Sequence, residues 1–209
     1  MSKKQSTLFN MILSLTLIAL VAAAALAAVF LITKPYIDDQ KDEKKSAALE
    51  KVLPGFDLKN NVTTDVSVPV RNDKDTTKMD SVYVHLAYQK DGQLFGAAVE
   101  SFTNKAFSGS FSIMVGFDKD GNILGSEVIA AAETPGLGDK IKDDKPGNFR
   151  SGFLKKNPSQ SDFNLRVKKD GGEIDAITAA TISSRAYCDA VNRAAQAYAK
   201  AIEMKGGKK

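Results

Sequence analysis

Hydrophobic and polar positions divide the chain into three regions, of which the first is apolar. It runs from Leu8 to Ile32, inside a stretch from Gln5 to Thr33 that holds no charged residue. As a helix, its roughly 25 residues would reach about 37 Å, more than the roughly 30 Å of a bilayer's hydrocarbon core. The pattern therefore predicts one spanning helix within an N-terminal transmembrane anchor, residues 1–35.

A cleaved secretory signal is the alternative for this segment. Lys3 and Lys4 make a positively charged start, and the small residues from Ala22 to Ala28 offer cleavage sites. The apolar run continues beyond the usual signal-peptide core, which favours the anchor. Lysines flank the apolar segment on both sides, and the positive-inside rule is weak before long exported domains. Charge counting therefore does not fix the orientation of the helix in the membrane.

A charged and then amphipathic stretch follows at residues 36–57. In SAALEKVLPGF, the apolar residues Ala47, Leu49 and Val52 can share one face of a short helix before Pro54 and Gly55 stop it. We interpret residues 36–57 as a stalk helix and linker, which leaves residues 58–209 for the globular domain.

The third region begins with alternating apolar and polar positions, the pattern of half-buried strands. The alternation occurs in five segments: 65–70, 82–88, 94–102, 110–117 and 123–130. Turn signals at Lys90–Gly92 and Asp118–Gly121 indicate strands joined largely as antiparallel hairpins. From Ala176 onward the spacing becomes helical, up to about Met204. An antiparallel sheet followed by a long C-terminal helix predicts an α+β domain.

Composition agrees with one folded domain and argues against a nucleic-acid-binding protein. Hydrophobic residues make up 43% and charged residues 26%, as in ordinary globular proteins. The net charge is +4, but three of the lysines precede Tyr36, where there is no acid, so the remainder is nearly neutral. Clustered cations with stacking aromatics are missing from the pattern, and we expect no nucleic-acid partner.

Two residue types occur once each. Cys188 is the only cysteine, which excludes an intramolecular disulfide or a cysteine-based metal site within this chain. Its place in a predicted helix indicates a small buried hydrophobe. His85 is the only histidine and lies in an alternating run, so we expect a residue on a sheet face and not a metal ligand.

One segment with candidate chemistry follows the last predicted strand. It reads Glu133, Thr134, Pro135, Gly136, Leu137, Gly138. The two glycines let the backbone turn tightly and approach a flat ligand, to which Leu137 offers an apolar contact. Taken alone, the segment is a turn, and an ordinary connecting loop is the favoured interpretation.

A second segment lies where the long helix begins. It runs from Asp175 through Thr178, Ala179, Ala180, Thr181, Ile182 and Ser183 to Ser184. Hydroxyl residues at a helix start commonly cap its free amides. The same amides and the helix dipole also favour an anion, so a phosphorylated cofactor is the other interpretation.

Together the two segments resemble the FMN-binding domain family, found in the G subunit of Rnf-type ion-translocating oxidoreductases and in the C subunit of sodium-translocating NADH:quinone reductases. In that family an acidic residue, two others and then Ser/Thr-Gly-Ala-Thr are recognised by a flavin transferase. The enzyme joins the FMN phosphate to the last threonine. The matching positions are Asp175, Thr178, Ala179, Ala180 and Thr181.

The resemblance implies that Thr181 carries a covalent FMN and that Glu133, Thr134, Gly136, Leu137 and Gly138 form a loop on the flavin side. Ala179 departs from the family's usual glycine, and alanine is strained if the position needs a positive φ. The short length and the GLGDK sequence favour the Rnf protein over its quinone-reductase counterpart.

The resemblance also implies partners and a location. These are the other membrane and peripheral subunits of an Rnf-type complex, a flavin transferase during maturation, and the lipid bilayer. The globular domain is expected on the periplasmic side of a bacterial inner membrane. The complex couples electron flow between ferredoxin and NAD to movement of sodium ions or protons, and this chain is not catalytic alone.

Two functions of other classes remain as alternatives. A hydrolase with a Ser or Thr nucleophile needs a base, but His85 is the only histidine and no Gly-x-Ser-x-Gly motif occurs. A membrane-anchored, non-redox scaffold subunit would use Thr181 only as a helix-start residue. Flavin that persists on the denatured chain distinguishes the scaffold from the flavoprotein.

Overall fold

The structure is a computed structural model that describes residues 8–57, 61–71, 79–145, 147–160 and 164–206. The elements in chain order are α1 (Leu8–Val52), β1 (Val62–Arg71), β2 (Met79–Tyr88), β3 (Leu94–Ala106), β4 (Gly109–Asp118), β5 (Ile123–Ala131), the short 3-10 helices η1 (Gly138–Lys142), η2 (Phe149–Phe153) and η3 (Lys168–Asp170), and α2 (Thr181–Gly206). Contacts divide the chain into two compact units, Met1–Glu43 and Lys44–Lys209.

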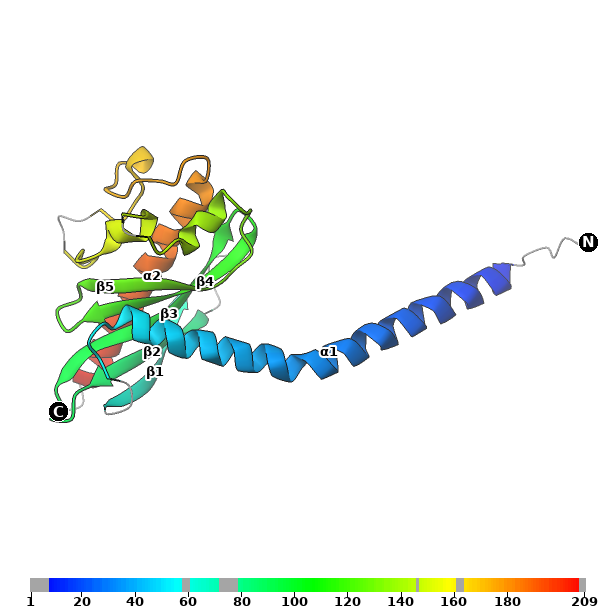
Figure 1. The fold of residues 1–209 in the computed structure, drawn as a ribbon, viewed down its shortest axis with the longest axis horizontal. Coiled ribbons are helices and arrows are strands. Elements are labelled where there is room, and N and C mark those ends of the chain that lie inside the picture. The colour runs from blue at the N-terminus through cyan, green and yellow to red at the C-terminus, as the bar shows by residue number, and fades with distance from the viewer. Residues whose placement is uncertain (1–7, 58–60, 72–78, 146, 161–163, 207–209) are drawn as a thin grey trace, which may run out of the picture. The chain divides into compact units, whose positions relative to one another are not determined.

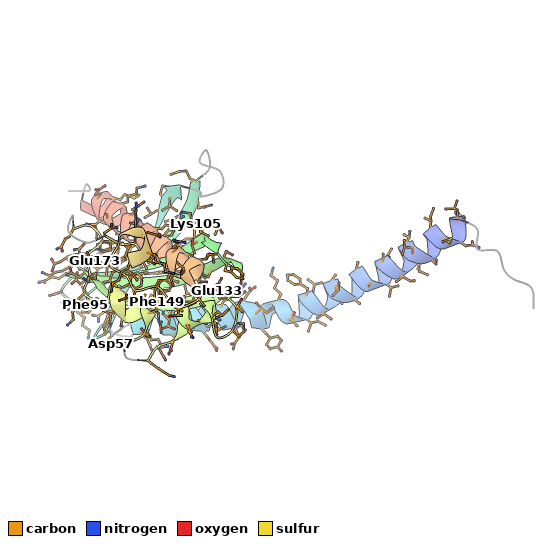
Figure 2. All side chains as sticks on the ribbon, turned by 90° about the horizontal axis from the view of Figure 1, so that it is seen from above. Asp57, Phe95, Lys105, Glu133, Phe149 and Glu173 are labelled. Atoms are coloured by element: carbon orange, nitrogen blue, oxygen red, sulfur yellow. The ribbon has the colours of Figure 1, made fainter. Side chains whose placement is uncertain are left out.

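The first unit consists of α1 up to Glu43. Its described side chains point outward around the helix (Figure 2), and every residue from Leu8 to Glu43 is exposed. Its apolar part is long enough to cross a membrane, as the sequence predicts. The helix continues through Pro35, which costs one backbone hydrogen bond without ending it. Residues 8–52, which belong to the predicted anchor and stalk, therefore form one helix.

The second unit is built on a five-stranded antiparallel sheet in which every strand pairs with the next along the chain (Figure 1). Register places Val84 of β2 opposite Val99 of β3, and Val99 opposite Val115 of β4. All five predicted strands are present, and Gly92 and Gly121 close the two predicted turns with backbone hydrogen bonds. The α+β fold predicted from the alternation is confirmed.

One face of the sheet is covered by α2, which lies behind it in Figure 1. Alternating strand residues and the apolar stripe of the helix form this main core, including Val84, Leu86, Val99, Val115, Phe117, Tyr187, Val191 and Tyr198. The buried Ser101 hydroxyl donates to the carbonyl of Ala190 at 2.7 Å, which fixes the helix against β3. Cys188 is buried in the same core, as predicted, and burial raises the pKa of its thiol to about 12.

The opposite face of the sheet carries the last turns of α1. Ala48, Val52, Leu53 and Phe56 pack there against Ala87, Ala98 and Met114. The helix end lies so close that a Cβ on Gly116 would stand 1.9 Å from the carbonyl oxygen of Val52. Glycine at 116 is therefore what lets the backbone of α1 touch the sheet.

His85 lies on this second face, as predicted for a sheet-face residue. Its Nδ1 is 2.7 Å from Oδ1 of Asp65 on β1, and its Nε2 is 3.1 Å from Oε1 of Glu100 on β3. Lys45 of α1 pairs with the other oxygen of Glu100 at 3.0 Å. A row of four charged or titratable side chains thus joins the first three strands to the end of α1.

Candidate functional site

The loop after β5 turns sharply because of Gly136. Its φ is +76°, a conformation that costs glycine little. The carbonyl of Thr134 accepts hydrogen bonds from the amides of Leu137 at 3.1 Å and Asp139 at 3.2 Å, and these close the turn before η1. The loop places Glu133 inside the domain while Leu137 stays 42% exposed.

The start of α2 is held by a second set of local bonds. The Ala180 amide donates to the carbonyl of Ile177 at 3.0 Å, and the Ser184 hydroxyl accepts from the Ile177 amide at 2.9 Å. Between them, Ala179 has a φ of +61°, in the left-handed region. The helix therefore begins at Thr181, five residues after the start of the helical spacing, because a left-handed residue cannot belong to an α-helix.

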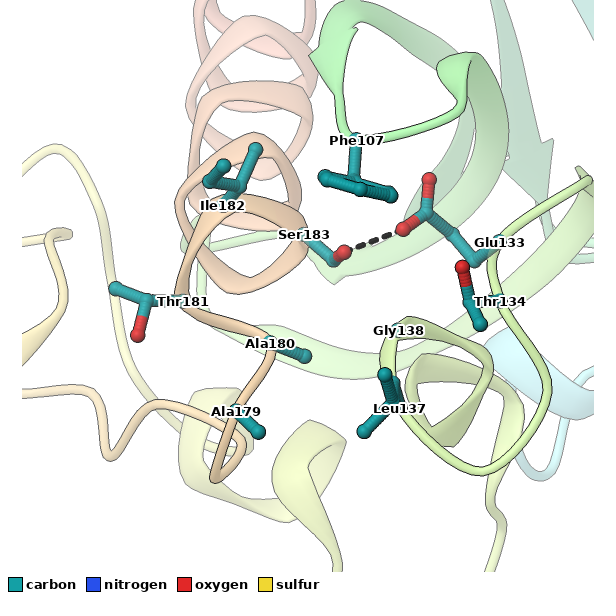
Figure 3. A pocket seen from close by; sticks show the side chains of 10 residues that line it. All are labelled: Phe107, Glu133, Thr134, Leu137, Gly138, Ala179, Ala180, Thr181, Ile182 and Ser183. Atoms are coloured by element: carbon teal, nitrogen blue, oxygen red, sulfur yellow. Dashed lines mark hydrogen bonds between the residues drawn. The ribbon is translucent and has the colours of Figure 1, made fainter.

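These two segments meet at a pocket of about 320 Å³ (Figure 3). A third segment, the turn between β3 and β4, joins them. The lining residues are Phe107, Glu133, Thr134, Leu137, Gly138, Ala179, Ala180, Thr181, Ile182 and Ser183. Most of the wall is apolar, and the side chains of Phe107, Leu137 and Ile182 are exposed at 68%, 42% and 48%. Such a wall suits a flat, largely apolar ring with a polar tail.

Glu133 connects all three segments of the pocket. Although only 5% of it is exposed, it accepts a hydrogen bond from the Ser108 amide at 3.0 Å and another from the Ser183 hydroxyl. A Cβ on Gly138 would stand 2.3 Å from the Glu133 carboxylate and 2.6 Å from the Ser183 hydroxyl oxygen. Position 138 therefore requires glycine because a side chain would clash there. Position 136 favours glycine because its φ is positive.

Thr181 is the first residue of α2 and is half-buried. In the view of Figure 3 its side chain points away from Glu133 and Phe107, while its backbone borders the pocket. The first helical hydrogen bond is donated by the Ser184 amide to the carbonyl of Ala180 at 3.0 Å. The amides of Thr181, Ile182 and Ser183 precede that bond, at the positive end of the helix dipole.

The structure brings together most of the site residues predicted from sequence. Seven of them line the pocket: Glu133, Thr134, Leu137, Gly138, Ala179, Ala180 and Thr181. Gly136 shapes the loop without lining the pocket, and the exposed Asp175 and Thr178 lie outside the lining. Lys168 pairs with Asp175 at 2.7 Å.

Sequence reasoning missed three lining residues, Phe107, Ile182 and Ser183. Phe107 lies in a hairpin turn far from either motif, and no local pattern marks it. Ser183 belongs to the hydroxyl-rich helix start, but only the fold shows that Glu133 accepts its hydrogen bond.

Comparison with known proteins agrees with this geometry. Residues 107–196 match the model of the FMN-binding domain, a range that includes all three pocket segments. The G subunit of the ion-translocating oxidoreductase complex of Aliivibrio fischeri is 36% identical over 187 residues, covering 89% of this chain and 88% of that protein. The chain belongs to the family of G subunits of ion-translocating oxidoreductase complexes.

Other members of this G-subunit family match over similar lengths. The Haemophilus influenzae protein is 35% identical, in a match that covers 85% of this chain and 84% of that protein. The Vibrio cholerae protein is 33% identical, in a match that covers 88% of this chain and 87% of that protein. Among solved structures, NqrC of Shewanella oneidensis has the same fold, with a TM-score of 0.50 and 21% identity. That match covers 66% of this chain and 69% of NqrC.

Proposed function

We propose that this chain is the FMN-carrying electron-transfer subunit of a membrane-bound, Rnf-type ion-translocating ferredoxin:NAD oxidoreductase, with FMN attached covalently to Thr181. The observation that carries the proposal is the meeting of the Glu133–Gly138 loop with the start of α2 at one apolar pocket. Membership of the G-subunit family and the match to the FMN-binding domain support it.

The residues present fit FMN. The apolar side chains of Phe107, Leu137 and Ile182 would contact the isoalloxazine ring, with Thr134 as a polar contact at its edge. The early amides of α2 would meet the phosphate, because they are free of helical partners and lie at the positive helix end. A phosphoester at Thr181 is consistent with the half-buried position of this residue, whose backbone borders the pocket and whose hydroxyl an enzyme can reach from outside.

When bound, FMN would supply one- and two-electron redox chemistry, and the chain would hold and tune it. Glu133 fixes the relative positions of the pocket's three segments through Ser108 and Ser183. Gly138 leaves room for that arrangement, and the positive φ of Gly136 shapes the turn from which Leu137 lines the pocket. Preorganised walls limit the rearrangement that accompanies a change in the flavin's charge, which favours fast electron transfer.

Attachment would require a flavin transferase during maturation. The Thr181 hydroxyl would lose its proton as its oxygen bonds to the flavin phosphorus of a flavin dinucleotide donor, while the donor's phosphoanhydride bond breaks and a nucleoside monophosphate leaves. Asp175, Thr178 and Ala179 are exposed, so an enzyme can reach the sequence that precedes Thr181. Their exposure supports a role in recognition and not in direct contact with the ring.

The proposed location is a bacterial inner membrane, with residues 1–35 as the anchor, residues 36–57 as the stalk and linker, and residues 58–209 as a periplasmic FMN-binding domain. Helix α1 is long and apolar enough for the span. The partners would be the membrane and peripheral subunits of the complex and the lipid bilayer. A tethered flavin would not be lost by dissociation outside the cytoplasm.

The test is to express the full-length chain with and without a flavin transferase and to separate it under denaturing conditions. We expect yellow-green fluorescence and an FMN-sized mass increase only with the transferase. Thr181→Val should abolish both signals, whereas Thr181→Ser keeps a hydroxyl and should restore part of the signal. An unmodified wild-type chain would instead favour the non-redox scaffold.

A further inference from the structure

A second groove, separate in its lining from the flavin pocket, lies beside the outer edge of β5. Its volume is about 470 Å³. One wall is a stripe of α1, Lys44, Ala47, Ala48 and Lys51, whose spacing puts all four residues on one helix face. The end of β5, Val128–Ala131, forms another wall, and Glu127 and Lys142 complete the lining.

The β5 edge is covered along only part of its length. Ile123 exchanges backbone hydrogen bonds with the segment after η2, accepting from Lys155 at 2.8 Å and donating to Lys156 at 2.9 Å. The Ser126 carbonyl accepts from the Arg150 guanidinium at 2.8 Å. Within the described parts of the chain, residues 128–131 have no comparable partner on their outer side. A short strand edge with open backbone groups therefore faces the groove.

The groove has an excess of positive charge. Its one acidic residue, Glu127, lies 2.7 Å from the buried Arg150 and 3.6 Å from Lys51. Arg150 is nearer and less exposed, so it is the stronger partner of that carboxylate, and the ion pair of the exposed Lys51 with it is the weaker one. Lys142 pairs with Asp139 at 2.6 Å, so the excess resides on Lys44 and Lys51.

The shape of the helix wall suits an extended chain. Ala47 and Ala48 are small and leave room between the two lysines. Lys51 lies seven positions after Lys44 in the helix, or about 10.5 Å along the axis. Carboxylates two or four residues apart on one face of a strand are about 7 or 14 Å apart, within reach of two flexible lysine side chains.

We infer that this groove binds an extended acidic segment of a neighbouring subunit, which adds as a short strand to residues 128–131 and places its carboxylates against Lys44 and Lys51. Backbone hydrogen bonds along the edge supply the register, and the two lysines select acidic segments over others. The inference rests on the proposed place of the chain in a multisubunit complex.

The test uses the assembled complex in native membranes, with a photo-crosslinking amino acid in place of the exposed Ala130. We expect the cross-linked peptide to come from one neighbouring subunit and to contain acidic residues at alternate positions. Amide hydrogen exchange at residues 128–131 should be slower in the complex than in the isolated full chain. Lipid headgroups alone would leave those amides unprotected.

Charge variants provide the matched controls. Lys44→Glu with Lys51→Glu should reduce the cross-link yield about fivefold to tenfold, as expected for reversing two exposed charges. Lys44→Gln with Lys51→Gln removes the two positive charges without adding repulsion toward Glu127. This variant should also reduce the cross-link yield, but by a smaller factor. Lys90→Glu with Lys119→Glu makes the same charge change at two exposed hairpin turns and should leave the yield unchanged.

Three results would overturn the inference: cross-links to lipid only, unchanged yield in both lysine variants, or no slowing of exchange at residues 128–131. Fluorescence of the denatured chain separates this failure from failure of the proposed function. Loss of docking with flavin still on Thr181 removes only the groove assignment, whereas a wild-type chain without flavin counts against the flavoprotein itself.

Discussion

The Ser183 hydroxyl donates a hydrogen bond to the Glu133 carboxylate, which joins the first turn of α2 to the loop after β5. The other carboxylate oxygen accepts from the Ser108 amide in the turn between β3 and β4. One buried carboxylate thus connects the three segments that line the pocket. Its two partners are distant in sequence, because Ser108 lies 25 residues before Glu133 and Ser183 lies 50 residues after it. Its position makes Glu133 the residue on which the pocket's geometry depends.

Replacing Glu133 with alanine should destabilise the second unit by about 2–3 kcal/mol, because the buried Ser183 hydroxyl is left without its acceptor and the Ser108 amide, in a part-buried bond at an exposed turn, also loses one. Ser183→Ala removes one of the two bonds and should cost about 1 kcal/mol. Thermal unfolding of the full-length chain measures both. Equal losses in the two variants would contradict a carboxylate shared between two donors.

The two glycines of the loop should respond differently to alanine. Gly138→Ala forces a Cβ to within 2.3 Å of the Glu133 carboxylate, so it should break the bond to Ser183 and lower flavin attachment strongly. Gly136→Ala meets nothing within 4 Å and has only its positive φ to overcome, about 1 kcal/mol. The amount of covalent flavin in the two variants, measured at matched expression, checks this order.

Ala179→Gly should stabilise the chain and, under the proposed attachment of FMN to Thr181, raise the rate of that attachment. Alanine at a φ of +61° is strained by about 1 kcal/mol, and glycine relieves that strain. Glycine also makes the unfolded chain more flexible, which offsets part of this stabilisation. We still expect the free energy of unfolding to rise. Thermal unfolding and the rate of transferase-dependent flavin attachment both test it. A slower rate would mean that the transferase reads the alanine methyl group.

The sheet can be predicted from the sequence because strand alternation is a local signal. In β2, Val82, Val84 and Leu86 are buried while Ser81 and Tyr83 are exposed, and this period of two needs no knowledge of the partner strand. The apolar stripe of α2 is a local signal of the same kind. The spacing puts the start of that helix too early, since the alanine-rich residues before Thr181 continue the helical pattern while Ala179 leaves the helical conformation.

The pocket can be predicted only in part because its remaining walls depend on tertiary contacts. Glu133 and Thr181 stand in recognisable motifs, but Phe107 reaches them only because β3, β4 and β5 are neighbours in the sheet. The groove beside β5 has no sequence signal either. It exists because Gly116 and Gly125 let the end of α1 lie directly on the sheet.

The row formed by Asp65, His85, Glu100 and Lys45 should make stability depend on pH. The hydrogen bond to Glu100 is the main cause that raises the pKa of His85 above 6.5, and Asp65 adds to it against the opposing effect of burial. Burial alone would raise the pKa of Glu100, but the hydrogen bonds from His85 and Lys45 outweigh it and lower that pKa below 4.5.

The two shifts act at opposite ends of the pH range. A raised histidine pKa stabilises the fold fully below pH 6.5, and the contribution is lost as the pH rises through the folded-state value. A lowered carboxyl pKa stabilises it above pH 4.5, and that contribution is lost as the pH falls through the folded-state value. The row of Asp65, His85, Glu100 and Lys45 therefore stabilises the fold most between about pH 4.5 and pH 6.5.

His85→Gln should flatten the alkaline side of this profile, because glutamine can still hydrogen-bond to Glu100 or Asp65 but does not titrate. Thermal unfolding of the full-length chain in detergent, from about pH 5 to about pH 9, compares the variant with the wild type. We expect the wild type to lose more stability than the variant as the pH rises above 6.5. Parallel profiles would mean that His85 stays neutral throughout and that the row is held by hydrogen bonds alone.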